Sequence, residues 1–219
     1  AGPGACSTQE TIETAKAMEA AGVDALSVIS PYFVQPTDEE LYEHFKAVAE
    51  SVKIPIILYN IPRLTGVNIN STVFERLTAL DNVAGIKDSS RNIENLQSYI
   101  DVAKKKGLAV LVGSDGIIAQ GYRMGATGAI AGMSNVIPKL MTDMFKALME
   151  KRDEEADKLQ EEVNVIRDVN RLATMPSVLK RALELGNIAE AGPARKPVFE
   201  TTPELDKKIK EMLKHYGLI

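Results

Sequence analysis

Five short runs of apolar, mostly β-branched residues mark the first two thirds of the chain. They cover residues 23–30, 54–60, 83–87, 108–113 and 127–132. None of them alternates cleanly between apolar and polar positions, which is typical of strands buried on both faces in a parallel sheet. The runs begin roughly 20 to 30 residues apart, which is close to the repeat of successive strand–helix units. The pattern therefore predicts consecutive βα units.

Helices are predicted between these runs and throughout the rest of the chain. Thr37, with Glu40 three residues later, has the spacing of a capping box at a helix N-terminus. Gly22 fits the position just after a helix C-terminus. After residue 135 no further strand is predicted. The predicted helices cover residues 8–21, 37–51, 71–80, 92–106, 117–124, 140–151, 154–172, 178–185 and 203–216.

The order of these elements predicts an α/β fold, either an open doubly wound sheet or part of a (β/α)₈ barrel. Residues 1–5 (AGPGA) form a glycine-rich turn that leads into a helix without a strand in front of it. We therefore expect a partial (β/α)₈ TIM barrel of about five parallel strands, with the first three βα units missing. The expected domains are residues 1–138, with the fourth to eighth strands, and residues 139–219, the C-terminal helical region.

Composition narrows the class of protein but not its chemistry. The chain has 26 Lys and Arg against 30 Asp and Glu, a net charge of −4, and this balance argues against a nucleic-acid partner. No apolar run approaches the roughly 20 residues that cross a bilayer. The single cysteine, Cys6, suits a reducing cytoplasm, and the two distant histidines, His44 and His215, leave little for a zinc site. We expect a soluble cytoplasmic protein without a membrane partner or a metal.

Two residues at strand ends could carry chemistry. Lys87 closes the third apolar run, and an amine in a partly apolar site can attack a ketone to form a Schiff base. The alternatives are a surface lysine or an ion pair with Asp88. Tyr59 closes the preceding run, and its phenol could transfer protons at the same edge of the sheet. Its alternative is an aromatic side chain that only packs.

Other polar and glycine positions have two interpretations each. Asp115 lies in a Gly-Ser-Asp-Gly turn and could bind a polyhydroxy substrate or cap the helix that follows. Gly85 and Gly132, inside predicted strands, mark either a close approach to a ligand or ordinary packing. Arg63 could bind a carboxylate or be an exposed turn residue.

Two linked motifs identify a family. Residues 59–66 (YNIPRLTG) followed by residues 85–90 (GIKDSS) resemble the N-acetylneuraminate lyase/dihydrodipicolinate synthase family of pyruvate-dependent class I aldolases. Residues 1–5 and 30–33 (SPYF) look like that family's turn after the third strand and its fourth-strand end. The resemblance runs in order to the C-terminus and suggests an N-terminally truncated member. It implies a (β/α)₈ barrel with C-terminal helices and a homo-oligomer, a dimer or tetramer.

The resemblance also implies a reaction. Lys87 would form an imine with pyruvate, and Tyr59 would transfer protons. No separate cofactor is implied, because the protonated imine itself stabilises the carbanion. The implied reaction makes or breaks a carbon–carbon bond between pyruvate and an aldehyde, most like N-acetylneuraminate lyase or a 2-keto-3-deoxy sugar acid aldolase. The implied substrate-binding positions are Leu64, Thr65, Gly113, Asp115, Gly116 and Gly132.

Five departures from the family pattern keep alternatives open. Leu64 stands where the synthases carry an arginine, which favours the lyases and sugar-acid aldolases. Gly116 and Gly132, however, replace a glutamate and a serine of the neuraminate lyases. Phe33 stands at the position of the relay tyrosine, and the loop that binds the pyruvate carboxylate is not in the chain. The alternatives are a dihydrodipicolinate synthase, a catalytically impaired fragment or assembly module, and an open flavodoxin-like sheet, which the lack of a phosphate loop disfavours.

Overall fold

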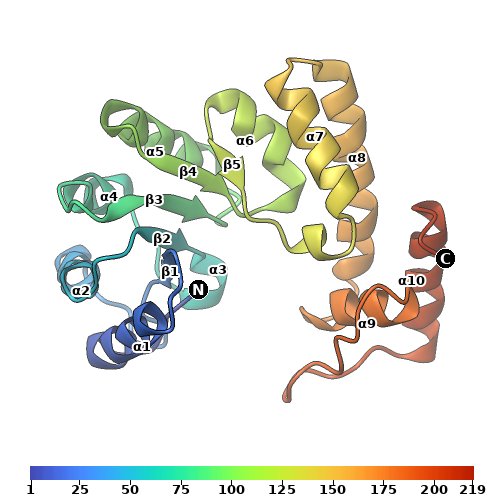
Figure 1. Cartoon of the computed structure of the whole chain (residues 1–219), viewed down its shortest axis with the longest axis horizontal. Coiled ribbons are helices and arrows are strands. Elements are labelled where there is room, and N and C mark those ends of the chain that lie inside the picture. The colour runs from blue at the N-terminus through green and yellow to red at the C-terminus, as the bar shows by residue number, and fades with distance from the viewer. The chain divides into compact units, whose positions relative to one another are not determined.

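A computed structural model describes all of residues 1–219. Strands and helices alternate in its first part, and helices follow (Figure 1). The strands are β1 (Leu26–Ile29), β2 (Ile56–Asn60), β3 (Val83–Asp88), β4 (Ala109–Val112) and β5 (Gly128–Ala129). The helices are α1 (Thr8–Ala20), α2 (Asp38–Glu50), α3 (Pro62–Thr65), α4 (Ser71–Leu77), α5 (Ile93–Lys106), η1 (Asp115–Ile117), α6 (Ile118–Met124), η2 (Gly132–Asn135), α7 (Pro138–Met149), α8 (Asp153–Asn170), α9 (Ser177–Leu185) and α10 (Pro203–His215), where η marks a 3₁₀-helix. Each predicted strand and helix has a counterpart.

The five strands form one parallel sheet in the order of the sequence, which confirms the predicted α/β class. The last strand is shorter than predicted, because β4 ends at Val112 and offers β5 no partner beyond it. The amide of Ile130 makes the last bond, to the carbonyl of Val112, at 3.0 Å. Gly132 therefore lies in η2, and its placement inside a strand was wrong.

Only one face of the sheet is fully buried. Helices α1, α2, α4 and α5 lie side by side along it (Figure 1). Leu58, Ile86 and Val110 point to that face and are at most 1% exposed. Tyr59 and Lys87, which point to the other face, are only partly buried. This second face is therefore less buried than the prediction of strands buried on both faces requires.

Polar caps fix where the helices begin. Thr37 accepts a hydrogen bond from the Glu40 amide, and the Glu40 carboxylate accepts one from the Thr37 amide at 2.8 Å, so the predicted capping box is confirmed. Asn70 and Asn92 cap α4 and α5 by accepting hydrogen bonds from the amides of Val73 and Asn95. Such caps each stabilise a helix by roughly 0.5–2 kcal/mol. They also fix the turns that follow the strand ends.

Gly85 occupies an irregular point of β3. The pairing of β2 with β3 shifts register between Ile56 and Ile57, so one residue of β3 is bulged beside Gly85. A Cβ atom on Gly85 would lie 2.1 Å from the carbonyl oxygen of Ala109 on the neighbouring strand. The close approach is therefore to backbone, which favours the packing interpretation of this glycine over a ligand contact.

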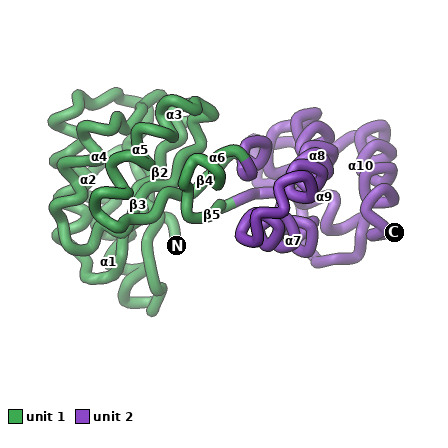
Figure 2. Tube along the Cα trace, turned by 90° about the horizontal axis from the view of Figure 1, so that it is seen from above, with its two compact units in different colours: residues 1–114, 120–130 green, residues 115–119, 131–219 purple.

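The chain divides into two compact units (Figure 2). The first comprises residues 1–114 and 120–130, with the sheet and its helices. The second comprises residues 115–119 and 131–219. Inside the second unit α8 packs on α7, α9 and α10. No helix combines the length and the apolar composition that a membrane crossing requires.

Candidate active site

Lys87 and Tyr59 lie next to each other at the ends of two neighbouring strands. They are register partners in the parallel pairing of β2 with β3, so their side chains project from the same face of the sheet. The Lys87 Nζ atom is 3.9 Å from the centroid of the Tyr59 ring. At this distance the ammonium ion is attracted by the electron-rich ring face. The geometry brings together the two residues predicted to carry chemistry.

Asp88 does not form the ion pair considered for Lys87. Successive side chains of a strand point to opposite faces, so Asp88 faces the helices and is 2% exposed. Its Oδ1 atom accepts a hydrogen bond from Asn60 Nδ2 at 2.9 Å, and its Oδ2 atom accepts one from Ser90 Oγ at 2.7 Å. Burial raises the pKa of the Asp88 carboxyl, and the hydrogen bonds from Asn60 and Ser90 oppose that rise.

The polar network around Asp88 was not identified from the sequence. Asn60, at the end of β2, is fully buried, and its Nδ2 also donates to Asn68 Oδ1 at 2.9 Å. The Tyr99 hydroxyl donates to the Ile69 carbonyl beside this network, and burial raises the pKa of Tyr99. The sequence feature that could have indicated this network is the polar residue directly after each predicted site residue, Asn60 after Tyr59 and Asp88 after Lys87.

Two strand-end hydroxyls are buried without a hydrogen-bond partner. They belong to Ser30, which follows β1, and Ser89, which follows β3. Gly113, a predicted substrate-binding position, lies against Ser89 and Lys87. A Cβ atom on Gly113 would be 2.0 Å from Ser89 Oγ and 2.8 Å from Lys87 Cε. The absence of a side chain at residue 113 therefore leaves room for the lysine stem.

We expect Gly113→Ala to displace the Lys87 side chain. The added methyl group requires the Ser89 and Lys87 side chains to shift, and a misplaced nucleophile can lower a rate by about 10²-fold. The measurement is the rate of covalent adduct formation at Lys87 with pyruvate and borohydride. Gly128→Ala is the matched control, because its Cβ atom would make an ordinary contact of 3.4 Å with Leu111. Equal rates for both variants would contradict the expectation.

Leu64 and Thr65 belong to the short helix α3, which directly follows β2. Thr65 is buried, and its hydroxyl accepts a bond from the Val67 amide at 3.2 Å, which holds the turn together. Leu64 is 68% exposed. The side chain of Gln35 lies against Gly66, at 3.1 Å from a Cβ atom built there. The loop after β1 therefore adjoins α3.

The other three predicted substrate-binding residues, Asp115, Gly116 and Gly132, belong to the second unit. Asp115 does not cap the helix that follows it. Its Oδ1 atom accepts a hydrogen bond from the Met133 amide at 3.1 Å, so it caps η2 instead. A Cβ atom on Gly116 would be 2.3 Å from Cζ of Arg167, so this glycine leaves space for the guanidinium group of α8.

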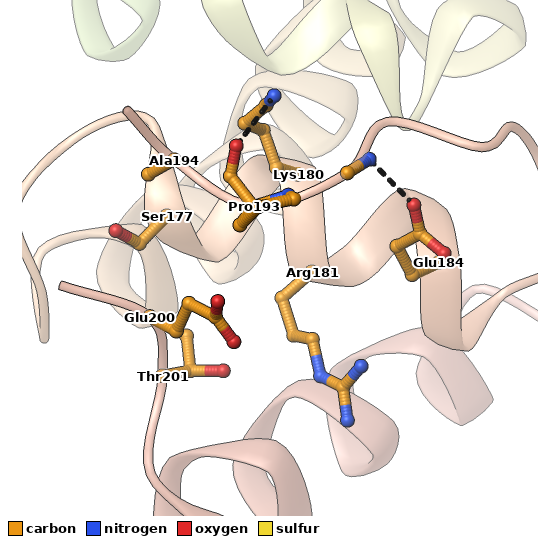
Figure 3. A pocket seen from close by; sticks show the side chains of 9 residues that line it. Ser177, Lys180, Arg181, Glu184, Pro193, Ala194, Glu200 and Thr201 are labelled. Carbon is orange, nitrogen blue, oxygen red and sulfur yellow. Dashed lines mark hydrogen bonds between the residues drawn. The ribbon is translucent and has the colours of Figure 1, made fainter. Parts of the chain in front are cut away.

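A cavity of about 230 Å³ lies in the second unit, beside α9 (Figure 3). Lys180 Nζ donates to the carbonyl of Ala191 at 2.6 Å and to that of Pro193 at 3.0 Å. Glu184 Oε1 accepts from the amide of Gly192 at 2.7 Å. These charged groups hold the segment after α9 in place. None of the predicted site residues lines the cavity, whose lining residues are Ser177, Lys180, Arg181, Glu184, Gly192, Pro193, Ala194, Glu200 and Thr201.

A lysine and a tyrosine at the carboxyl ends of adjacent parallel strands define a class of α/β protein with an enzyme-like strand-end site. The model of the dihydrodipicolinate synthetase family matches residues 1–216, and the chain belongs to that family. Members of this family are pyruvate-dependent class I aldolases and lyases. The family resemblance predicted from the two motifs is thereby confirmed.

Individual relatives agree with this assignment. The 4-hydroxy-tetrahydrodipicolinate synthase of Archaeoglobus fulgidus is 38% identical over 218 residues, which are 100% of this chain and 75% of the relative. The structure of dihydrodipicolinate synthase from Thermotoga maritima matches with a TM-score of 0.94 and 28% identity, over 100% of this chain and 75% of that one. The chloride-inhibited dihydrodipicolinate synthase from Acinetobacter baumannii, complexed with pyruvate, matches with a TM-score of 0.93 and 32% identity. The match covers 100% of this chain and 74% of that one.

These relatives bear on the choice between the predicted activities. They are synthases, and they support the synthase alternative better than the neuraminate lyase or sugar-acid aldolase interpretation. The preference for lyases depended mainly on Leu64, a single position. Identity over the whole chain outweighs that one difference.

Proposed function

We propose that the chain is an aldolase-type synthase that joins pyruvate to an aldehyde through an imine on Lys87. The observation that carries the proposal is the contact of Lys87 Nζ with the Tyr59 ring, 3.9 Å away, at the carboxyl ends of adjacent strands. The similarity to 4-hydroxy-tetrahydrodipicolinate synthases, which covers all of this chain and 75% of each of two relatives, supports the same reaction class.

In the proposed reaction, the neutral amine of Lys87 attacks the ketone carbon of pyruvate. Loss of water from the carbinolamine gives the protonated imine, which withdraws electrons from the adjacent methyl carbon. That carbon loses a proton and, as the enamine, attacks the aldehyde carbon. Water then releases the product and restores the amine. The Tyr59 phenol, on the strand next to Lys87, would donate and accept the protons of these steps.

The remaining predicted site residues would shape the pocket. Gly113 would give the Lys87 stem its space, and the unpaired hydroxyl of Ser89 beside it would be available to a substrate oxygen. Leu64, Thr65, Asp115, Gly116 and Gly132 are proposed as substrate-binding positions on the strength of the family motifs. Substrate specificity would depend on them.

Three further features are part of the proposal. The five strands would be the fourth to eighth of a (β/α)₈ barrel, residues 1–138, with residues 139–219 as a helical region. A homo-oligomer is supported by apolar side chains on the loop after β1 and on the adjoining helix α3, Phe33 at 93% exposure and Leu64 at 68%. Phe33 also has a left-handed φ of 81°, a costly backbone conformation for a bulky residue. A cytoplasmic location stays a prediction from composition.

Borohydride reduction in the presence of pyruvate tests the proposal. An imine on Lys87 would be reduced to a stable secondary amine, and peptide mass spectrometry would find the added three-carbon acid on the peptide that contains Lys87. The reaction without pyruvate is the control. A wild-type chain with no adduct on Lys87, or with labelling spread equally over exposed lysines such as Lys53, would show that the proposal is wrong.

A further inference from the structure

A buried hydrogen bond joins the last residues of β2 and β3 behind the lysine and tyrosine. Asn60 Nδ2 donates to Asp88 Oδ1 at 2.9 Å, and both side chains are at most 2% exposed. We infer that this Asn60–Asp88 pair is a positioning pair, which holds Lys87 against the Tyr59 ring. The catalytic consequence of the inference rests on the proposed function, whereas its structural part does not.

The register of β2 and β3 connects the buried Asn60–Asp88 pair to the partly buried contact between Tyr59 and Lys87. Tyr59 is the register partner of Lys87, and Asn60 is the partner of Asp88. Because side chains alternate along a strand, a bond on the helix side limits how far the two strands separate or slide on the other side. Asn60 and Asp88 each follow directly after the residue whose position they hold, Tyr59 and Lys87.

Both members of the pair are anchored to the elements that follow their strands. Asn60 Oδ1 accepts a bond from the Ile69 amide at 3.0 Å, just before α4. Asp88 accepts bonds from the Ser90 amide at 3.1 Å and from Asn95 Nδ2 of α5 at 3.4 Å. Neither side chain can turn away without breaking several buried or partly buried hydrogen bonds, and an unpaired buried polar group is costly.

The backbone continues the same constraint past the strand ends. The Ser89 amide donates to the Asn60 carbonyl at 2.8 Å, and the Gly113 amide donates to the Asp88 carbonyl at 2.8 Å. An apolar pair could fill the same space without burying polar groups, but it would not be directional. Directional hydrogen bonds between the last residues of β2 and β3 specify one register of the two strands, and therefore one position of Lys87 over Tyr59.

Two measurements test the inference on the full chain. The first is the NMR shift of the Lys87 ε-methylene, which the Tyr59 ring moves upfield when the side chain lies over it; Lys87→Ala assigns the signal. The second is the rate of borohydride trapping with pyruvate. Asp88→Ala and Asn60→Ala should lose the upfield shift and trap roughly 10- to 100-fold more slowly. Asp88→Asn should keep both near wild type, because an amide can accept from Asn60 and donate to Ser90 Oγ.

Thr8→Val is the matched control for lost stability. It removes another partly buried hydrogen bond of the first unit, the one between Thr8 Oγ1 and His44 Nδ1 at 2.9 Å, and it should leave the Lys87 signal unchanged. If the alanine variants do not fold, the milder Ser90→Ala is measured instead. It removes one hydrogen bond to Asp88 and should reduce the upfield shift and the trapping rate by less than the alanine variants would.

Three results would overturn the inference. They are an upfield shift that persists in the folded alanine variants, trapping no slower than in Thr8→Val, or an Asp88→Asn variant as impaired as Asp88→Ala. A wild-type chain that forms no adduct would instead refute the proposed function. The NMR shift would still decide whether Asn60 and Asp88 position Lys87.

Discussion

Replacement of Lys87 by alanine is expected to abolish synthase turnover, with a loss of roughly 10³-fold or more. The reason is that no other amine can take its place as the atom that bonds to pyruvate. Lys87 is the lysine in contact with the Tyr59 ring, at 3.9 Å from the ring centroid. The measurement is the consumption of pyruvate in the presence of an aldehyde.

Lys87→Arg separates the chemical role of the lysine from its charge. A guanidinium group stays protonated and can rest on the Tyr59 ring, but it cannot form an imine. This variant should therefore fold as well as the wild type and lose activity as completely as Lys87→Ala. Lys53→Ala, at an exposed lysine, should keep full activity. Turnover retained in Lys87→Arg would refute the imine mechanism.

The first unit is expected to lose stability as the pH falls from about 6.5 to about 4, because of His44. This side chain is 4% exposed, and its Nε2 atom has no hydrogen-bond partner. Burial lowers the pKa of His44 from 6.5 to about 4. Between these values the unfolded chain binds a proton that the folded chain does not, so acidification favours unfolding. Full protonation of the unfolded state would cost about 3 kcal/mol of stability.

The measurement is the free energy of unfolding from urea titrations between pH 7 and pH 4. His44→Asn keeps a side chain that can form a hydrogen bond with Thr8. Its free energy of unfolding should fall by about 3 kcal/mol less than that of the wild type. Asp88 has the opposite effect on stability, because its raised pKa makes the folded chain bind a proton before the unfolded chain does. This contribution is the same in the wild type and in His44→Asn, so the difference between them does not contain it. Equal declines for His44→Asn and wild type would contradict the prediction.

The strands could be predicted from the sequence because each is a short apolar run bounded by turn residues. The end of β5 could not, since it depends on where the neighbouring β4 stops, at Val112. Burial of the second sheet face was also mispredicted. An apolar composition allows a strand to be buried on both faces, but it does not determine which elements cover each face. Helix limits were predicted to within a few residues, and the capping box of Thr37 and Glu40 shows why.

The site was predictable only in part. Lys87 and Tyr59 were found because each closes an apolar run, and parallel strands bring their ends to one edge. The bond between Asn60 and Asp88 could not be found, because it requires the register between two strands. The space that Gly113 leaves for Lys87 depends in the same way on β4 being adjacent to β3. Pairing between strands is a three-dimensional property that spacing along the chain does not contain.

The two margins of the sheet differ from the long, regular edges that recruit further strands. At β1 the first residues run alongside, with the Ser27 amide bonded to the carbonyl of Ala1 at 2.7 Å. At the opposite margin β5 is only two residues long, Gly128–Ala129. Unpaired edges template cross-β growth only when several consecutive amides and carbonyls are free. A sheet whose margins are short or already paired offers few consecutive free amides and carbonyls to a further strand.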